Sequence, residues 1–402
     1  MRSFTKIFQQ TFWQILGKVV TSLSTFIILG LVTRNYGQAG TGVFTLALTY
    51  LGIFYLLADF GFNAHILRRA KEPAGQRIGI EWQKLLGTRL IWSAMLTVVA
   101  VGLLPFWPFS SAEFMQSVAF GSLAIIASGV FVTSNLVFQG ALRYELSAIA
   151  TVVGTVVSLA LFLFFTVARF PVTFLPTAHL IGWIVIALAA LRLVRKLSSA
   201  VIPIYDLRYT INLFKQSWPV AATLALNVIY FRADAFMIAY FKSASDVGIY
   251  NVAYSVFQSA LVLPTFIMNA YYPMMLKSFK GIRVVLFGLA GLSLLGIGVT
   301  FILAPLIINI LTGGGFDGSI ESLRILSLGF PAYFLSSLMM WILIARGRYK
   351  LMLLLYMSGL VVNLILNLIY IPQYSFLAAS WITVISEYLI LILQIMVLSF
   401  KR

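Results

Sequence analysis

About twelve apolar stretches follow one another along this sequence, each long enough to cross a lipid bilayer, and only short links separate them. A transmembrane helix needs about 20 mostly apolar residues, and this length predicts an all-α integral membrane protein with about 12 transmembrane helices. The approximate limits of the predicted spans are 10–33, 41–66, 83–107, 114–140, 146–168, 174–195, 217–241, 247–275, 282–310, 320–345, 350–372 and 374–399.

The composition also indicates a membrane protein. The 402 residues are 61% hydrophobic and 10% charged, with a mean hydropathy of +0.99, whereas a soluble globule carries about 25% charged residues. Cysteine is absent, which excludes disulfides and thiolate metal sites. The two histidines, His65 and His179, lie near span ends and are predicted to be interfacial, so neither a metal nor another bound cofactor is expected.

The net charge of +17 indicates membrane lipid rather than nucleic acid as a partner, because the basic residues are concentrated in the short links. With a cytoplasmic N-terminus, 21 of the 28 Lys and Arg residues fall on the inner side and four on the outer side. This asymmetry predicts a multi-pass protein of the cell (inner) membrane with both termini in the cytoplasm. The remaining three basic residues lie inside predicted spans: Lys18, Arg89 and Arg232.

The two halves of the chain resemble each other at an offset of 206 positions. This shift lays Gly42–Tyr50 on Gly248–Val256 and Leu57–Ala64 on Leu263–Ala270, so that Gly42 coincides with Gly248. Chance similarity between apolar segments is the alternative, but the polar and glycine matches keep one register. We therefore predict two six-helix lobes related by a parallel repeat. The predicted parts are an N-terminal lobe 1–196, a cytoplasmic linker 197–216 and a C-terminal lobe 217–402.

Six predicted spans carry a polar face at helical spacing. These faces are Gln14, Lys18, Thr21 and Thr25; Thr45, Thr49, Asp59 and Asn63; Thr223, Asn227, Tyr230 and Asp234; Asn251, Tyr254, Ser255 and Gln258; Tyr356, Asn363, Asn367 and Tyr370; and Ser380, Thr383, Glu387 and Gln394. A Ser, Thr or Asn on such a face can line a cavity, or it can form a hydrogen bond of about 0.6 kcal/mol to a neighbouring helix. The sequence supports both interpretations equally for these residues. A charge in lipid costs roughly 2.5–3.5 kcal/mol, so a wet cavity is favoured for the ionisable members. These are Lys18, Asp59, Asp234 and Glu387.

The two arginines inside spans have more than one interpretation. Arg232 is two residues from Asp234, a rotation of about 200°, so it does not share the face of Asp234. Its guanidinium either reaches round the helix or pairs with a neighbouring helix. Arg89 lies at a depth similar to that of Asp59, which suggests a gate-like ion pair; snorkelling of Arg89 to the headgroups is the alternative.

Several motifs, in one order along the whole chain, resemble those of a known family. They are ILGLVTRNYGQAGTGVFTLALTYLGIFYLLADFGFNAHILRRA, FRADAFMIAYFKSASDVGIYNVAY, LTGGGFDGSIESLRIL, LIARGRYK and NLILNLIYIPQYSFLAASWITVISE. The chain resembles the lipid-linked oligosaccharide (O-antigen-type) flippases of the multidrug/oligosaccharidyl-lipid/polysaccharide exporter superfamily.

The resemblance implies a transporter, not an enzyme, that uses alternating access of two lobes. Its cargo would be a polyprenyl-diphosphate-linked saccharide, moved from the cytoplasmic to the outer leaflet for cell-surface polysaccharide, with polysaccharide-assembly enzymes as candidate partners. The resemblance also implies that cavity cations, here Lys18, Arg89 and Arg232, contact the diphosphate. Asn251, Gln258 and Asn363 are predicted to contact the saccharide. Asp59, Asp234 and Glu387 are assigned to gating or to binding a coupling H⁺ or Na⁺.

Two other functions compete with this prediction. A cation-coupled multidrug exporter of the same superfamily is the nearest alternative, but a site for cationic drugs would need acidic residues to dominate, and three basic residues oppose that. A membrane glycosyltransferase or polymerase is expected to carry an acidic base in the first outer link. Residues 34–41 contain neither Asp nor Glu, and no phosphate-binding glycine loop is present.

Overall fold

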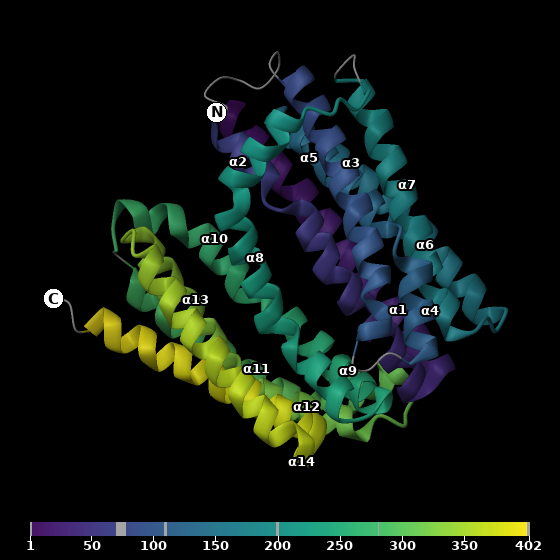
Figure 1. The fold of residues 1–402 in the computed structure, drawn as a ribbon. Helices are drawn as coiled ribbons and strands as arrows, with labels where there is room; N and C mark the ends of the chain where they lie inside the picture. The colour runs from purple at the N-terminus through teal and green to yellow at the C-terminus, as the bar shows by residue number, and fades with distance from the viewer. Residues whose placement is uncertain (1, 70–77, 108–110, 198–200, 280, 400–402) are drawn as a thin grey trace. The chain divides into compact units, whose positions relative to one another are not determined.

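The structure is a computed structural model that describes residues 2–69, 78–107, 111–197, 201–279 and 281–399; a few side chains inside helices, that of Asn227 among them, lie outside the description. The described residues form helices and no strands (Figure 1). The helices are α1 (Arg2–Asp59), α2 (Phe62–Arg69), α3 (Ile78–Gly102), η1 (Leu104–Phe106), α4 (Ala112–Gly121), α5 (Ala124–Gly140), α6 (Tyr144–Val167), η2 (Val172–Phe174), α7 (Leu175–Arg195), α8 (Leu207–Phe241), α9 (Ala244–Ala260), α10 (Val262–Lys277), α11 (Ile282–Thr312), α12 (Asp317–Ser327), α13 (Phe330–Ala345) and α14 (Tyr349–Ser399).

The helical stretches agree with about twelve membrane spans. Eight stretches of the described chain are long and apolar enough to cross a bilayer, and two further pairs of helical segments meet at a bend. Two of the eight, Leu16–Leu67 and Lys350–Ser399, have 52 and 50 residues, more than twice the length of about 20 that one crossing needs. Helices suit this setting because lipid offers the backbone no hydrogen-bond partners. The predicted fold class, with about twelve spans, is confirmed.

Each double-length helix is interrupted by one non-helical residue. The break in α1 is at Gly37 (φ 63°) and that in α14 is at Ser375 (φ 52°). Glycine adopts a positive φ readily, whereas serine is strained there. The hydroxyl of Ser375 donates a hydrogen bond of 2.8 Å to Asp246, in the first turn of α9. This contact stabilises the break in α14.

The chain forms two compact units. Unit 1 contains residues Met1–Tyr36 and Val43–Phe231, and unit 2 contains Gly37–Gly42 and Arg232–Arg402. The predicted division into 1–196, 197–216 and 217–402 differs from this one in two places. Residues 207–231, the larger part of α8, belong to unit 1, and the six residues Gly37–Gly42 belong to unit 2.

The start of α8 and the residues just before it pack tightly against unit 1. The ring of Phe214 lies 4.7 Å from Phe60 and 4.9 Å from Trp92 between centroids. The Lys84 ammonium pairs with Asp206 at 2.6 Å. The aromatic contacts and this ion pair attach residues of the predicted linker 197–216 to unit 1.

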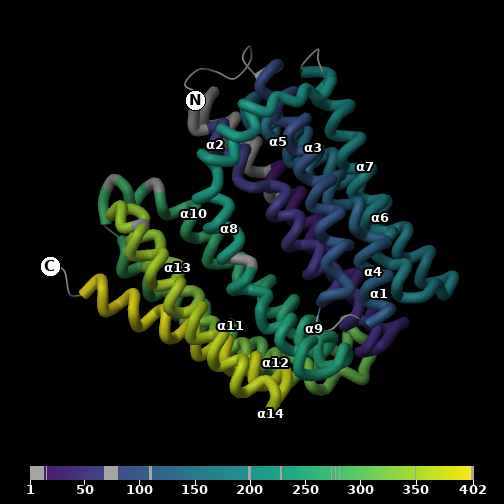
Figure 2. The backbone as a smooth tube through the Cα atoms, in the orientation of Figure 1, coloured from purple at the N-terminus to yellow at the C-terminus, as the bar shows by residue number. Residues whose placement is uncertain are grey.

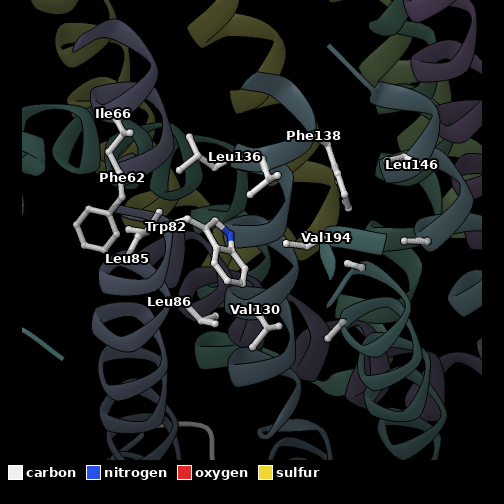
Figure 3. Packing of buried hydrophobic residues seen from close by; sticks show 14 of the residues in the cluster. Phe62, Ile66, Trp82, Leu85, Leu86, Val130, Leu136, Phe138, Leu146 and Val194 are labelled. Atoms are coloured by element: carbon white, nitrogen blue, oxygen red, sulfur yellow. The ribbon is translucent and has the colours of Figure 1, made fainter. Parts of the chain in front are cut away.

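The core of unit 1 is a cluster of buried apolar side chains from α2, α3, α5, α6, α7 and α8. Figure 3 shows Trp82 at its centre, near Leu86 and Val130. The indole N–H of Trp82 donates to the Thr133 carbonyl at 3.2 Å, so this large side chain is buried without an unsatisfied donor. Helices α6 and α7 run side by side at the edge of this unit (Figure 1).

In unit 2, Gly42 and Gly248 meet in a reciprocal contact. A Cβ atom on Gly42 would collide with the Ala244 carbonyl, and one on Gly248 would collide with the Gln38 carbonyl. Gln38 and Ala244 are also 206 positions apart, so the contact follows the register of the predicted repeat. Elsewhere in unit 2, α13 and α14 run side by side (Figure 2).

Candidate functional site

Arg89 of α3 is buried at the junction of α1 and α2 in unit 1. Its side chain has an exposed fraction of 1%. The guanidinium donates to Asn63 Oδ1 and to Thr133 Oγ1, both at 3.0 Å. It also donates to the Asp59 carbonyl oxygen at 2.9 Å and to the Asp59 carboxylate at 3.4 Å. The two Nη atoms are therefore satisfied within the protein, mainly by neutral acceptors, whereas the buried Nε has no hydrogen-bond partner in the described part of the chain.

The position of Asp59 explains this geometry. Asp59 is the last residue of α1, and Phe60 and Gly61 follow with positive φ of 51° and 70°. A helix C-terminus leaves carbonyl groups without partners, and its dipole favours a cation. Arg89 caps the end of α1, and the predicted Asp59–Arg89 ion pair is present in addition to this cap. Its role as a gate stays a prediction.

Asp234 of α8 is the centre of a second buried polar cluster, in unit 2. Its carboxylate accepts hydrogen bonds from Tyr250 Oη and Thr383 Oγ1, both at 2.8 Å, and from Asn367 Nδ2 at 2.5 Å. The exposed fraction of Asp234 is 3%. Three donors from three other helical segments thus satisfy one buried carboxylate, as burial of a polar group requires.

Asn363 extends this cluster along α14. Asn367 Nδ2 donates to Asn363 Oδ1 at 2.9 Å, and Asn363 Nδ2 donates to Ser386 Oγ at 3.3 Å. The Oδ1 atom of Asn367 is buried and has no hydrogen-bond partner in the described part of the chain. The cluster therefore places carboxylate, amide and hydroxyl oxygens together inside unit 2.

The other predicted site residues of unit 2 differ in exposure. The guanidinium carbon of Arg232 lies 5.8 Å from the centre of the Tyr254 ring of α9, so this half-buried arginine contacts a neighbouring helix. Glu387 is buried, close enough to Tyr254 to interact with it electrostatically. Asn251 is buried, and Gln258 is half-buried.

Lys18 is the exposed member of the predicted set in unit 1. It lies on α1 one turn before Thr21, whose hydroxyl donates to the Lys18 carbonyl at 2.9 Å. The structure thus joins Asp234 with Asn363, and Asp59 with Arg89, but gives Lys18 no place in either cluster. Tyr250 and Thr133 lie outside the predicted polar faces, and their contacts depend on neighbours that only the packing of the helices shows.

His179 also differs from its prediction. It lies one turn into α7, near the end of a span as expected, but it lines a pocket inside unit 1 with Trp183. The indole N–H of Trp183 donates to His179 Nε2 at 2.9 Å.

Solved structures of membrane transporters share this fold. The lipid II flippase MurJ in an inward closed conformation is similar over 97% of this chain and 87% of its own, with a TM-score of 0.77 and 13% identity. An inward-facing multidrug resistance MATE transporter of the MOP superfamily is similar over 96% of this chain and 98% of its own, with a TM-score of 0.69 and 14% identity. This chain therefore has the helical fold of these two proteins over nearly its whole length.

Sequence comparison identifies the family of this chain. Residues 7–279 match the profile of the family described as polysaccharide biosynthesis protein. A proposed O-antigen transporter of Shigella dysenteriae is 22% identical over 326 residues, which are 77% of this chain and 79% of that protein. The chain belongs to the polysaccharide biosynthesis protein family.

Proposed function

We propose that this protein is a flippase that moves a polyprenyl-diphosphate-linked saccharide from the cytoplasmic to the outer leaflet of the cell membrane, for cell-surface polysaccharide. The observation that carries the proposal is the likeness of nearly the whole chain to a lipid II flippase, in a chain of the polysaccharide biosynthesis family. The proposed orientation has both termini in the cytoplasm. Enzymes of polysaccharide assembly are its proposed partners.

The proposed mechanism is alternating access by rigid-body movement of the two units. The chain passes between the units after Tyr36, after Gly42 and after Phe231. Gly37, at the first of these points, has the positive φ that glycine adopts without strain. The small number of chain connections between the units and the conformational freedom of Gly37 support a hinge at Gly37.

We assign a diphosphate contact to Lys18 of unit 1, and the diphosphate contact of Arg232 of unit 2 stays a separate prediction. Lys18 is exposed and Arg232 is half-buried, so a ligand can reach both side chains. Arg89 is left out of the proposed contact set, because its guanidinium is buried among Asn63, Thr133 and Asp59.

The diphosphate assignment is tested in proteoliposomes that follow a fluorescent short-chain polyprenyl-diphosphate saccharide between leaflets. Lys18→Ala removes a charged contact worth about 1.5–3 kcal/mol, so we expect transport to slow about tenfold or more. Lys242→Ala, which removes another exposed lysine, is the matched control and should transport normally. Equal rates for Lys18→Ala and the control would remove Lys18 from the site.

The Asp234 cluster is the proposed site for a coupling H⁺ or Na⁺. Carboxylate, amide and hydroxyl oxygens are the ligands that hard cations prefer, and the buried Asn367 Oδ1 has no partner in the described chain. Asp234→Asn keeps the size of the side chain but removes its charge.

We expect Asp234→Asn to abolish the stimulation of transport by a proton or Na⁺ gradient. Asp317→Asn, which neutralises an exposed carboxylate of unit 2, is the control and should keep the stimulation. If Asp234→Asn responds to both gradients like the unchanged protein, the cluster does not bind the coupling ion.

A cation-coupled multidrug exporter is the second candidate function. The likeness to a MATE transporter over 96% of this chain favours it. The two candidates differ in cargo, because a drug exporter moves cationic dyes and a flippase moves an anionic lipid diphosphate.

A further inference from the structure

Unit 1 contains a pocket that neither buried polar cluster uses. Its cavity volume is about 230 Å³. Three helices line it with one face each, at spacing i, i+3, i+4 and i+7, and Phe131 of α5 completes the wall. The faces that matter here carry Thr21 and Thr25 of α1; Thr151, Thr155 and Ser158 of α6; and Trp183 of α7.

The hydroxyl groups of α6 are unusual for their surroundings. The span that contains them has a mean hydropathy of 2.4, yet Thr151, Thr155 and Ser158 lie on one of its faces. Hydrogen bonds between helices explain Ser158, which donates to the Ala178 carbonyl of α7 at 3.2 Å. The side-chain hydroxyls of Thr151 and Thr155 make no hydrogen bond to any residue that the structure describes. Their hydroxyls are available to a polar ligand.

The α1 wall offers acceptors. Thr21 Oγ1 donates to its own helix at Gly17, at 3.0 Å, and Thr25 Oγ1 donates to Thr21, at 2.9 Å. These bonds do not join helices, and the lone pairs of both oxygens remain able to accept. The pocket therefore presents hydroxyl donors on α6 and acceptors on α1.

Aromatic rings form another part of the wall. The rings of Phe131 and Trp183 lie 6.1 Å apart between centroids. The indole N–H of Trp183 is satisfied by His179, so its ring offers an apolar surface. Apolar walls with a few placed polar groups are typical of small-molecule sites. A volume of about 230 Å³ is below the roughly 300–1,000 Å³ of sites for drug-sized ligands, so one small ring fits better than a drug.

Lys18 relates this pocket to the proposed cargo. It lies three residues before Thr21 on the same face of α1, about 4.5 Å along the helix axis. In a lipid-linked saccharide the first sugar is bonded directly to the diphosphate. A phosphate on Lys18 would therefore bring that sugar to the pocket.

We propose that this pocket binds the first sugar ring of the lipid-linked saccharide, next to a diphosphate held by Lys18. This inference rests on the proposed flippase function and adds to it the location of the sugar. The hydroxyls of Thr151 and Thr155 bind sugar hydroxyl groups, and the rings of Phe131 and Trp183 pack against the sugar carbons.

The test measures binding and sided transport of two probes, a short-chain polyprenyl diphosphate with one sugar and the same lipid diphosphate without sugar. The double variant Thr151→Val/Thr155→Val keeps the shape and removes two hydroxyls. We expect it to weaken binding of the sugar-bearing probe about tenfold, from two lost hydrogen bonds, and to leave the sugar-free probe unchanged. Equal affinity of double variant and unchanged protein for the sugar-bearing probe would overturn the proposal.

A pocket-filling variant gives a second measurement. Thr155→Phe should block transport of the sugar-bearing probe, whereas Val156→Phe, which places the same ring on the exposed side of α6, should not. Normal transport of the sugar-bearing probe by Thr155→Phe would overturn the proposal that this pocket binds the sugar, but it would leave the flippase function intact. Failure of the unchanged protein to move the sugar-bearing probe overturns the flippase function itself, and the pocket assignment with it. A block by Thr155→Phe without any effect of the valine substitutions shows an apolar occupant and also overturns the sugar assignment.

Discussion

At the scale of single residues, Arg89 shows how a charge inside a span can be structural. Its contacts are the two neutral side chains Asn63 and Thr133 and the carbonyl and carboxylate of Asp59. Similar depth in two neighbouring spans was enough to predict the pairing with Asp59. The cap on α1 was not predictable, because the sequence does not show that α1 ends at Asp59 with a free carbonyl.

We predict that Arg89→Gln destabilises the protein by about 3 kcal/mol or more, because loss of a buried charged partner leaves several acceptors unsatisfied. Arg143→Gln is the control: Arg143 pairs with Glu145 at an exposed site, so its loss should change stability by less than about 1 kcal/mol. Thermal unfolding in detergent measures both. Equal melting temperatures for the two variants would show that the buried contacts of Arg89 contribute little.

Asp206 provides a pH-dependent contact at the start of α8. Hydrogen bonds from the Lys84 ammonium and the Tyr209 N–H lower the pKa of Asp206 below its ordinary value of 3.8. A carboxyl whose pKa is lower in the folded than in the unfolded protein stabilises the folded state. This contribution is complete when the pH lies above the pKa of the unfolded protein. That contribution is lost as the pH falls through the lower, folded pKa.

We therefore expect Asp206→Asn to melt below the unchanged protein at pH 6, and the difference to shrink as the pH falls below about 4. Asparagine also caps helices, so the substitution isolates the charge. Melting temperatures between pH 3 and 7 measure this difference. A difference that stays constant with pH would exclude the ion pair as its cause.

At the scale of elements, the approximate positions of the membrane spans follow from the sequence, but the ends of the helices follow less well. The apolar runs predict the spans because about 20 residues are needed for each crossing. The predicted span limits place breaks at 34–40 and at 373, close to Gly37 and Ser375. The positive φ of Ser375 does not follow from the sequence, since it depends on the contact with Asp246. The polar faces likewise predict a buried site for Asn363 and for Asp234 separately. Only the packing of the helices shows that both belong to one hydrogen-bonded cluster.

The contact between Gly42 and Gly248 gives a prediction for two elements, α1 and α9. A methyl group at either position would collide with backbone atoms of the other element, so Gly42→Ala or Gly248→Ala should destabilise by about 1–3 kcal/mol. Gly288→Ala in α11 is the control, because its Cβ would meet open space, and alanine should stabilise that helix by up to about 1 kcal/mol. Unchanged unfolding of Gly42→Ala would contradict the close approach.

At the scale of the whole molecule, the division into units depends on α8. Its helical pattern continues through Phe231 and Arg232, so no local signal marks the boundary between them. The sequence predicts the number of spans and two compact parts. The predicted linker 197–216 and the boundary of the compact units at Phe231 differ, because the contacts of Phe214 and Asp206 with unit 1 depend on tertiary packing.

The measurement that tests the central claim most directly compares two cargoes in the same vesicles. Proteoliposomes receive a fluorescent polyprenyl-diphosphate saccharide and, separately, a cationic dye under a proton or Na⁺ gradient. The flippase function predicts protein-dependent movement of the lipid-linked saccharide between leaflets and no export of the dye. Export of the dye without movement of the saccharide would contradict it and identify a drug exporter.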